Sequence, residues 1–453
     1  MVRLFGTDGV RGLANKDITA EMAVDLGVAA AHVLAERGEF QGHRPRAILG
    51  RDTRISGQFL SSAVAAGLAS AGVDVLDVGV IPTPAVARLT AATGADIGVV
   101  ISASHNPMPD NGVKFFGRGG FKLADAVEEA IEERLGEPWE RPTGANVGAI
   151  IASHDLANTY VDDLVDAVTD FAGRELPLTG LRVVVDGAHG AASTVGPRAL
   201  EAAGATVVAI HCEPDGTNIN DGVGSTHLGP LRKAVSAHGA DMGIAYDGDA
   251  DRCLAVDAAG AVVDGDKIMG ALALAMRASG TLYRDTLVAT VMSNLGLHRA
   301  MRDAGIDIVE TAVGDRYVLE AMREGGYGLG GEQSGHLIVS RYSPTGDGIL
   351  TSLLLGSLVA ADGSLAELTQ GIASLPQVLV NVPGVDRSRV HSDAGVQAAA
   401  EALRAELGDG GRVLLRASGT EPLVRVMVEA LSMEDAQRHA DSLAGVVAAR
   451  LAL

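Results

Sequence analysis

Leu181-Arg-Val-Val-Val-Asp-Gly-Ala-His-Gly190 begins a strand–helix–strand unit, which Ala203-Gly-Ala-Thr-Val-Val-Ala-Ile210 completes. The β-branched apolar residues of both segments are typical of strands, and the stretch between them is long enough for a helix. The Ala-Gly pair predicts the end of that helix, because glycine readily adopts the left-handed conformation found there. Such a unit predicts a right-handed crossover between parallel strands of one sheet.

The same pattern occurs twice more, at residues 46–79 and 286–311. Any α/β protein contains such units, so the repeat indicates only the fold class. A more specific feature follows each copy, where a short apolar strand runs into a polar loop. These loops span residues 102–107, 247–252 and 331–336. Because open α/β sheets place functional loops at the carboxyl ends of strands, three such loops predict a cleft shared between domains.

The pattern changes from about residue 373, where the chain reads as strand, helix, strand, loop, strand and helix. The helix is expected at Asp393–Leu407 and one of the strands at Leu423–Glu429. We therefore expect an α/β protein with three related mixed-sheet α/β domains and a smaller C-terminal α+β domain around a central cleft. The expected boundaries of the four domains are 1–150, 151–256, 257–372 and 373–453.

Composition excludes several classes of protein. The formal net charge of −21, from 36 basic and 57 acidic residues, argues against binding to nucleic acids or to anionic membranes. Gly, Arg or Asp interrupts every apolar stretch well short of a membrane span. Cys212 and Cys253 are the only cysteines, too few for a disulfide framework or a cysteine zinc site. We expect a cytoplasmic protein in which any anionic substrate meets a locally positive site.

Asp247-Gly-Asp249-Ala-Asp251 directly follows an apolar strand. In an extended backbone these three carboxylates share one face, where they repel one another unless a cation lies among them. Oxygen ligands favour Mg²⁺ or Ca²⁺. An EF-hand loop is excluded, because Arg252 and Ala258 occupy positions that require Gly and Glu. The alternative interpretation is a solvated acidic turn between two strands.

Ser104 lies just past a strand end, without the G-x-S-x-G context of a hydrolase. Beside a divalent cation it is a candidate phosphoryl carrier, because the metal offsets the charge of a phosphoserine. Asn111-Gly112 predicts a tight turn that returns Lys114 toward the loop. Lysine is rare in this chain, which carries most of its positive charge on arginine. Lys114 is therefore a candidate general acid or base, with a surface lysine as the alternative.

Two further clusters carry candidate binding residues. Glu332, Ser334 and His336 alternate with small residues, a spacing that predicts three polar groups on one face, suited to neighbouring hydroxyls of a sugar. A polar strand end is the alternative. In the C-terminal loop, guanidinium groups, hydroxyls and free backbone N–H groups predict a cradle for a phosphate that does not react. The residues of this cradle are Arg416, Ser418, Gly419, Thr420 and Arg425.

Together the four loops resemble those of the α-D-phosphohexomutases, and the resemblance extends along the whole chain. Phe5-Gly-Thr-Asp-Gly-Val-Arg-Gly12 and Gly331-Glu-Gln-Ser-Gly-His336 favour the bacterial phosphoglucosamine mutase branch. Phosphomannomutase/phosphoglucomutases typically begin differently and carry Met at the position of Gln333. The four loops in this order are highly specific, and the chain matches the family pattern at every position that carries chemistry.

The resemblance implies interconversion of glucosamine 6-phosphate and glucosamine 1-phosphate through a 1,6-bisphosphate, on the route to UDP-N-acetylglucosamine and the cell wall. It implies that Ser104 is phosphorylated and that its phosphate binds one Mg²⁺ per subunit together with Asp247, Asp249 and Asp251. The resemblance also implies acid/base chemistry by Lys114 and support of the phosphoryl site by Arg11, His105 and Arg252. It implies sugar binding by Glu332 and Ser334, and phosphate binding by the cradle.

Three alternatives remain at this point. Phosphomannomutase/phosphoglucomutase activity is the nearest, and comparing glucosamine, glucose and mannose phosphates as substrates would decide it. A non-catalytic sugar-phosphate sensor predicts a missing nucleophile, metal ligand or lysine, and none is missing. A phosphoserine phosphatase leaves the sugar-binding loop unexplained. A homodimer is compatible with the sequence, which determines neither the oligomeric state, nor the source of the priming phosphate, nor regulation.

Overall fold

The structure is a computed structural model that describes residues 4–6, 8–40, 42–418 and 423–453. It divides into two compact units, which are described separately. Unit 1 comprises Met1–Val291 and Ile306–Gln370, and unit 2 comprises Met292–Gly305 and Gly371–Leu453. Among the described residues no helix is both long and apolar enough to cross a membrane.

The three strand–helix–strand units form as predicted, with parallel strands in each. A glycine with positive φ follows each helix, at Gly72 (90°), Gly204 (104°) and Gly305 (67°). The elements are β2 (Arg46–Arg51), α2 (Gly57–Ser70) and β3 (Asp74–Val80); β7 (Arg182–Asp186), α6 (Ala192–Ala202) and β8 (Thr206–Ile210); and β12 (Thr286–Thr290), α9 (Leu295–Asp303) and β13 (Asp307–Thr311).

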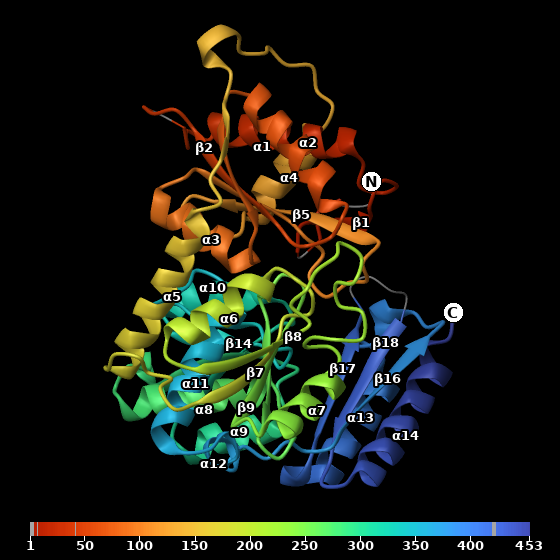
Figure 1. Ribbon diagram of the computed structural model, residues 1–453. Coiled ribbons are helices and arrows are strands. Elements are labelled where there is room, and N and C mark those ends of the chain that lie inside the picture. Colours follow the sequence, from red (N-terminus) through yellow and green to blue (C-terminus); the bar gives the residue numbers. More distant parts are fainter. Residues whose placement is uncertain (1–3, 7, 41, 419–422) are drawn as a thin grey trace. The chain divides into compact units, whose positions relative to one another are not determined.

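The first sheet of unit 1 has the strand order β1-β5-β4-β2-β3-β6. Alternation along its strands sends Leu49 and Val99 into the core under α1 and α2, while Gly50 and Gly98 face α3. Figure 1 shows α1 and α2 on one face of this sheet and α3 on the other. The further elements are β1 (Val10–Leu13), β4 (Ile97–Ile101), β5 (Asp110–Gly117), β6 (Ile150–Ala152), α1 (Ala20–Glu36), α3 (Thr83–Thr93) and α4 (Asp125–Glu133).

The second and third sheets of unit 1 are also mixed, with the orders β11-β10-β9-β7-β8 and β13-β12-β14-β15. In each, a short strand beside the parallel pair delivers a polar loop. The second sheet adds β9 (Met242–Tyr246), β10 (Cys253–Asp257), β11 (Val262–Val263), α5 (Leu156–Ala172) and α7 (Gly229–His238). The third adds β14 (Leu329–Gly331), β15 (Leu337–Val339), α8 (Gly265–Ala278), α10 (Asp315–Gly325), α11 (Gly348–Asp362) and α12 (Leu365–Thr369).

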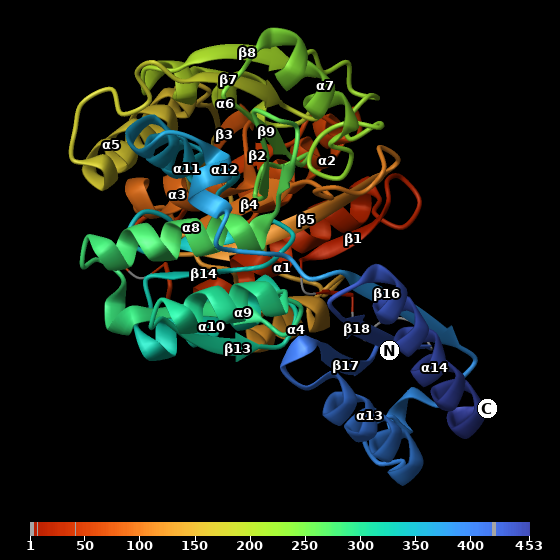
Figure 2. The same cartoon turned by 90° about the horizontal axis from the view of Figure 1, so that it is seen from below.

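Unit 2 contains an antiparallel sheet in the order β16-β18-β17, whose two long helices lie on one face (Figure 2). The predicted helix at Asp393–Leu407 is present with Asp393 as its N-cap, and the predicted strand Leu423–Glu429 is present as β18. The elements are β16 (Gln377–Pro383), α13 (Ala394–Leu407), β17 (Arg412–Ala417), β18 (Leu423–Glu429) and α14 (Met433–Leu451). Short 3-10 helices occur in unit 1 at Gly144–Asn146 and Tyr283–Asp285 and in unit 2 at Arg387–Arg389 and Gly408–Gly410.

The helix α9 belongs to unit 2, although both strands of its strand–helix–strand unit belong to unit 1. At its start, the backbone N–H of Leu295 donates to Glu429 Oε2 at 3.0 Å, and the Asn294 side chain donates to the carbonyl of Leu375 at 3.0 Å. The expected domains are continuous segments, whereas unit 2 combines two segments of the chain.

A buried tyrosine ties α5 to the start of α11 within unit 1. Tyr160 is fully buried, and its hydroxyl lies 3.0 and 3.1 Å from the two carboxylate oxygens of Asp347. Asp347 is also buried and caps α11 by accepting the N–H of Leu350. The carboxylate therefore depends on this hydroxyl for part of its solvation.

Replacing Tyr160 with Phe should lower the free energy of unfolding by about 1.5–3 kcal/mol, because a buried carboxylate loses a hydrogen bond. Denaturant unfolding followed by circular dichroism measures the change. Tyr317→Phe is the matched control, because Tyr317 is 43% exposed. Equal unfolding midpoints for the two variants would show that the Tyr160 hydroxyl contributes nothing to stability.

Candidate functional site

Ser104 lies directly beside the aspartate cluster. It follows β4 in a loop and has a left-handed backbone conformation (φ 52°). Its side chain is 1% exposed, and its hydroxyl donates to Asp247 Oδ2 at 2.5 Å and lies 3.3 Å from Nδ1 of His105. The serine loop of the first sheet and the acidic loop of the second therefore meet at one point.

Asp247, Asp249 and Asp251 are buried, and one oxygen of each lies within 4.8 Å of the others. The predicted extended backbone is wrong. The strand ends at Tyr246, and Asp247–Asp251 form a turn in which Ala250 has φ 56° and donates its N–H to the carbonyl of Asp247. The carboxylates converge because the chain turns around them.

The electrostatics of this cluster suit a hard divalent cation. Burial, and then the charges of Asp251 and Asp249, raise the pKa of Asp247 well above its usual value. Asp249 Oδ1 and Asp251 Oδ1 are buried and accept no hydrogen bond within the described part of the chain. Unsatisfied carboxylate oxygens at this spacing match the oxygen ligands that Mg²⁺ prefers.

Lys114 provides positive charge at the cluster. Its ammonium is 2.7 Å from Asp249 Oδ2 and 3.8 Å from Asp251 Oδ2, and the side chain is 3% exposed. Burial alone would lower the pKa of Lys114, but the two carboxylates outweigh it and raise that pKa. The predicted turn at Asn111-Gly112 is wrong, because both residues lie inside β5, where a side chain at Gly112 would clash with the carbonyls of Ser102 and Val10.

Arg11 and Arg252 form a positive rim beside His105. Burial, and then the charges of Arg252 and Arg11, lower the pKa of His105. The guanidinium of Arg11 lies 3.2 Å from Asp8, and that of Arg252 lies 3.8 Å from Asp251. The buried Nε atoms of both arginines donate to no group among the described residues. These donors are suited to an anion such as a phosphoryl group.

Glu332 and Ser334 lie together in a turn after β14, where Ser334 Oγ is 3.5 Å from Glu332 Oε2. The backbone N–H of Gly314 donates to Glu332 Oε1 at 3.1 Å, which fixes the carboxylate. The predicted alternating arrangement is wrong, because Gly335 has φ 93° and turns the chain. The His336 ring lies 3.7 Å from Asp251 and 3.6 Å from Asp315, and hydrogen bonding and charge from Asp251 outweigh burial and raise its pKa to about 9.

Sequence reasoning missed the residues that hold the serine loop. Arg54 is 1% exposed, and its Nε donates to Asp52 at 2.9 Å. Its terminal nitrogens donate to the carbonyl groups of Ser104, Asn106 and Pro107 in that loop, and to that of Asp110 at the start of β5. Asn220, from the second sheet, donates to the carbonyls of Ser104 and Asn106. The sequence does contain one signal for this role. Arg54 follows Asp52 by two residues, directly beyond the end of β2, and is the second arginine there after Arg51.

In unit 2, Arg416 on β17 is paired in register with Arg425 on β18, on the sheet face opposite α13 and α14. Burial, and then the charge of Arg425, lower the pKa of Arg416, as expected for two cations held side by side. Ser418 is 3% exposed, and its carbonyl accepts a hydrogen bond from Arg387, which the sequence did not single out. Gly419 and Thr420 lie outside the described residues.

Four family models match the chain in order. They are described as Phosphoglucomutase/phosphomannomutase, alpha/beta/alpha domain I (residues 2–140), domain II (158–260) and domain III (264–375), and the C-terminal domain (379–446). The mixed sheets of unit 1 and the small antiparallel sheet of unit 2 agree with this division into three α/β domains and a C-terminal domain.

Individual proteins are similar over nearly the same length. The phosphoglucosamine mutase of Acidothermus cellulolyticus is 63% identical over 450 residues, covering 99% of this chain and 96% of that protein. A Phosphoglucomutase/phosphomannomutase family protein from Burkholderia thailandensis has a TM-score of 0.79 at 25% identity, covering 99% and 97%. The Aspergillus fumigatus N-acetylphosphoglucosamine mutase, solved with GlcNAc-6P and magnesium, has a TM-score of 0.69 at 19% identity, covering 99% and 96%.

Asp249→Asn should weaken Mg²⁺ binding to the protein by at least about tenfold, the loss that follows even from removing a hydrogen-bond partner of a metal ligand. Isothermal titration calorimetry with MgCl₂ measures the affinity. Asp362→Asn is the control, because Asp362 is exposed at the end of α11. Unchanged Mg²⁺ affinity in Asp249→Asn would exclude the cluster as the metal site.

Proposed function

Because the chain belongs to the phosphoglucomutase/phosphomannomutase family, we propose that it is an intramolecular phosphotransferase that interconverts glucosamine 6-phosphate and glucosamine 1-phosphate. The name of the Acidothermus cellulolyticus relative supports the amino sugar as substrate. The observation that carries the mechanism is the Ser104 hydroxyl, buried 2.5 Å from Asp247 in the acidic cluster. The product would supply UDP-N-acetylglucosamine synthesis for the cell wall.

In the proposed reaction, phosphorylated Ser104 gives its phosphoryl group to O1 of glucosamine 6-phosphate. The bond from phosphorus to Ser104 Oγ breaks, the bond to O1 forms, and the O1 proton leaves. The resulting 1,6-bisphosphate reorients, and its C6 phosphoryl group passes to Ser104 while O6 takes up a proton. The phosphoserine is thereby restored, and the net change is an isomerisation.

Asp247, Asp249 and Asp251 would hold Mg²⁺ together with the phosphate of Ser104. When bound, the cation would offset the charges of these groups and bring the pKa of Lys114 back toward a range where it can exchange a proton. Lys114 is the proposed proton carrier for the sugar oxygens. Its buried position beside Asp249 keeps the ammonium in one place.

The remaining side chains position the substrate. Arg11, Arg252 and His105 would support the phosphoryl group with hydrogen-bond donors. Phosphoryl transfer needs such donors because it depends mostly on positioning and charge neutralisation. Glu332, Ser334 and His336 would hold sugar hydroxyls. The phosphate that is not being transferred would bind to Arg416, Ser418, Gly419, Thr420 and Arg425. This cradle must accept a phosphate on either end of the sugar, since the intermediate reacts in two orientations.

A coupled assay with glucosamine 6-phosphate tests the substrate. The specificity constant kcat/KM should be highest for glucosamine 6-phosphate when glucosamine, glucose and mannose phosphates are compared in the same buffer with Mg²⁺. A larger kcat/KM for glucose or mannose phosphate would replace the proposed substrate by that of a phosphoglucomutase or phosphomannomutase.

Ser104→Ala should abolish steady-state isomerisation, because it removes the proposed phosphoryl carrier. Intact-mass analysis should find one phosphate on the active protein and none on this variant, which should still bind sugar phosphate. Ser62→Ala is the control, because Ser62 is exposed on α2. An active wild-type protein that carries no phosphate at any stage of turnover would contradict the mechanism.

Arg416→Ala should reduce kcat/KM by about tenfold to a hundredfold, mainly through a higher KM, because a charged hydrogen bond contributes about 1.5–3 kcal/mol. Steady-state kinetics with the phosphorylated enzyme separates the two constants. Arg404→Ala is the control, because Arg404 pairs with Glu401 at the surface of α13. If Arg416→Ala kept the wild-type KM, Arg416 would not be a phosphate ligand.

A further inference from the structure

Lys122 makes a charged bridge in unit 1 that the proposed reaction steps do not use. The residue lies between β5 and α4, and its side chain is only 13% exposed. Its ammonium is 2.8 Å from Asp8 Oδ1 and 2.5 Å from Asp315 Oδ2. Burial alone would lower the pKa of Lys122, but the carboxylates of Asp315 and Asp8 outweigh it and raise that pKa. The bridge therefore remains charged at neutral pH.

The two carboxylates held by Lys122 each contact a proposed site residue. Asp8 precedes β1, and its other oxygen lies 3.2 Å from the guanidinium of Arg11. Asp315 begins α10 and lies 3.6 Å from Nε2 of His336. Side chains of alternating charge connect Arg11 to the aspartate cluster. Successive members lie 2.5–3.8 Å apart, measured between their charged nitrogen and oxygen atoms. The alternating series is Arg11, Asp8, Lys122, Asp315, His336, Asp251, Lys114 and Asp249.

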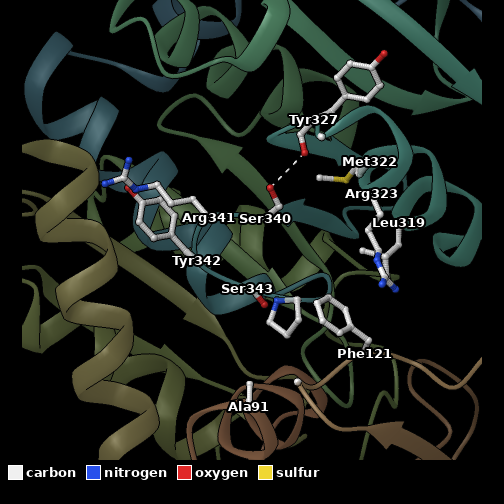
Figure 3. A pocket seen from close by; sticks show the side chains of 13 residues that line it. Ala91, Phe121, Leu319, Met322, Arg323, Tyr327, Ser340, Arg341, Tyr342 and Ser343 are labelled. Carbon is white, nitrogen blue, oxygen red and sulfur yellow. Dashed lines mark hydrogen bonds between the residues drawn. The ribbon is translucent and has the colours of Figure 1, made fainter.

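Phe121, the residue before Lys122, lines a pocket between the first sheet layer and α10. A cavity of about 420 Å³ separates Ala91 and Phe121 of the first sheet layer from Leu319 and Met322 on α10 (Figure 3). On the same helix Arg323 lies over the ring of Phe121 at 4.7 Å.

A second charged bridge joins the same layers, where Arg316 on α10 contacts Glu128 on α4 at 2.9 Å. The Lys122 bridge differs from this second bridge in that its two carboxylates, Asp8 and Asp315, also contact the proposed site residues Arg11 and His336.

We propose that Lys122 is a positioning residue for phosphoryl transfer, which sets the distance between Arg11 at the phosphoryl site and His336 in the sugar-binding loop. Without its ammonium, the partly buried carboxylates of Asp8 and Asp315 would face each other with the loss of their shared and shortest ion pair. Both would turn toward water, and Arg11 and His336 would each lose a partner. Errors of about 1 Å in such groups cost up to about a hundredfold in rate. This inference rests on the proposed function.

Lys122→Met tests the inference, because methionine keeps most of the length of the side chain but removes its charge. With glucosamine 6-phosphate as substrate, kcat should fall by about tenfold to a hundredfold, while KM changes by less than about threefold. Lys122→Arg keeps the charge and should restore kcat to within about threefold of the wild type. Arg316→Met, which removes the second bridge between the same layers, should leave kcat within the same limit. Thermal unfolding of each variant checks that it folds.

Three results would overturn the inference. The first is a folded Lys122→Met protein with wild-type kcat, and the second is a loss of kcat in Arg316→Met equal to that in Lys122→Met. The third is a folded Lys122→Arg protein whose kcat is more than about tenfold below that of the wild type. This third result tests the role of Lys122 even if Lys122→Met does not fold. The wild-type rate tests the proposed function, and the ratio of variant to wild type tests Lys122, so the two can fail separately.

Discussion

The burial of three carboxylates beside one serine is the constraint on which the rest of the site depends. Like charges in a water-poor environment repel strongly, and each loses solvation that the protein must replace. The raised pKa of Asp247 expresses this cost directly. Lys114, Arg252 and His336 lie around the cluster because they offset part of it. The carboxylate oxygens Asp249 Oδ1 and Asp251 Oδ1, which accept no hydrogen bond from the described residues, make a divalent cation a favourable occupant.

The same constraint explains why the site draws on all three sheets of unit 1. Groups from several loops surround the cluster. The serine comes from the loop after β4, the carboxylates from the loop after β9, and His336 from the loop after β14. β4, β9 and β14 each pair in parallel with the first strand of one strand–helix–strand unit. The three loops therefore lie at the equivalent carboxyl-terminal edge of each sheet. Repetition of one supersecondary unit therefore assembles different chemistries at one point.

Most of the fold could be predicted from the sequence, because the strand–helix–strand units have strong local signals. The Ala-Gly helix ends, for example, have no competing interpretation, and Gly72, Gly204 and Gly305 adopt the expected conformation. Local backbone conformation was harder to predict where tertiary contacts override it. Asn111-Gly112 is part of a strand because β1 and β4 pair on either side of it. The aspartates likewise lie on a turn, although their alternation suggested a strand.

Local patterns give only weak signals for the supporting residues. Arg54 holds the serine loop through carbonyl groups that any sequence would provide, so no partner residue signals its role. The importance of Lys122 depends on Asp315, 193 positions later, and on Asp8. The sequence does single out groups of unusual type and spacing, and the structure brings two of them together, Ser104 and the three aspartates. It does not identify the groups that hold them, because ordinary residues serve that purpose.

The placement of α9 in unit 2 bears on how the protein is made. Synthesis proceeds from the N-terminus, so Leu295 leaves the ribosome long before Glu429, which accepts its N–H 134 positions later. During that interval α9 has strands of unit 1 on both sides of it in the chain but none of its unit 2 partners. The third strand–helix–strand unit therefore cannot fold completely while the nascent chain emerges. Its helix can form its contacts within unit 2 only after the last part of the polypeptide has been synthesised. A fragment that stops at Gln370 would leave this helix without its docking surface.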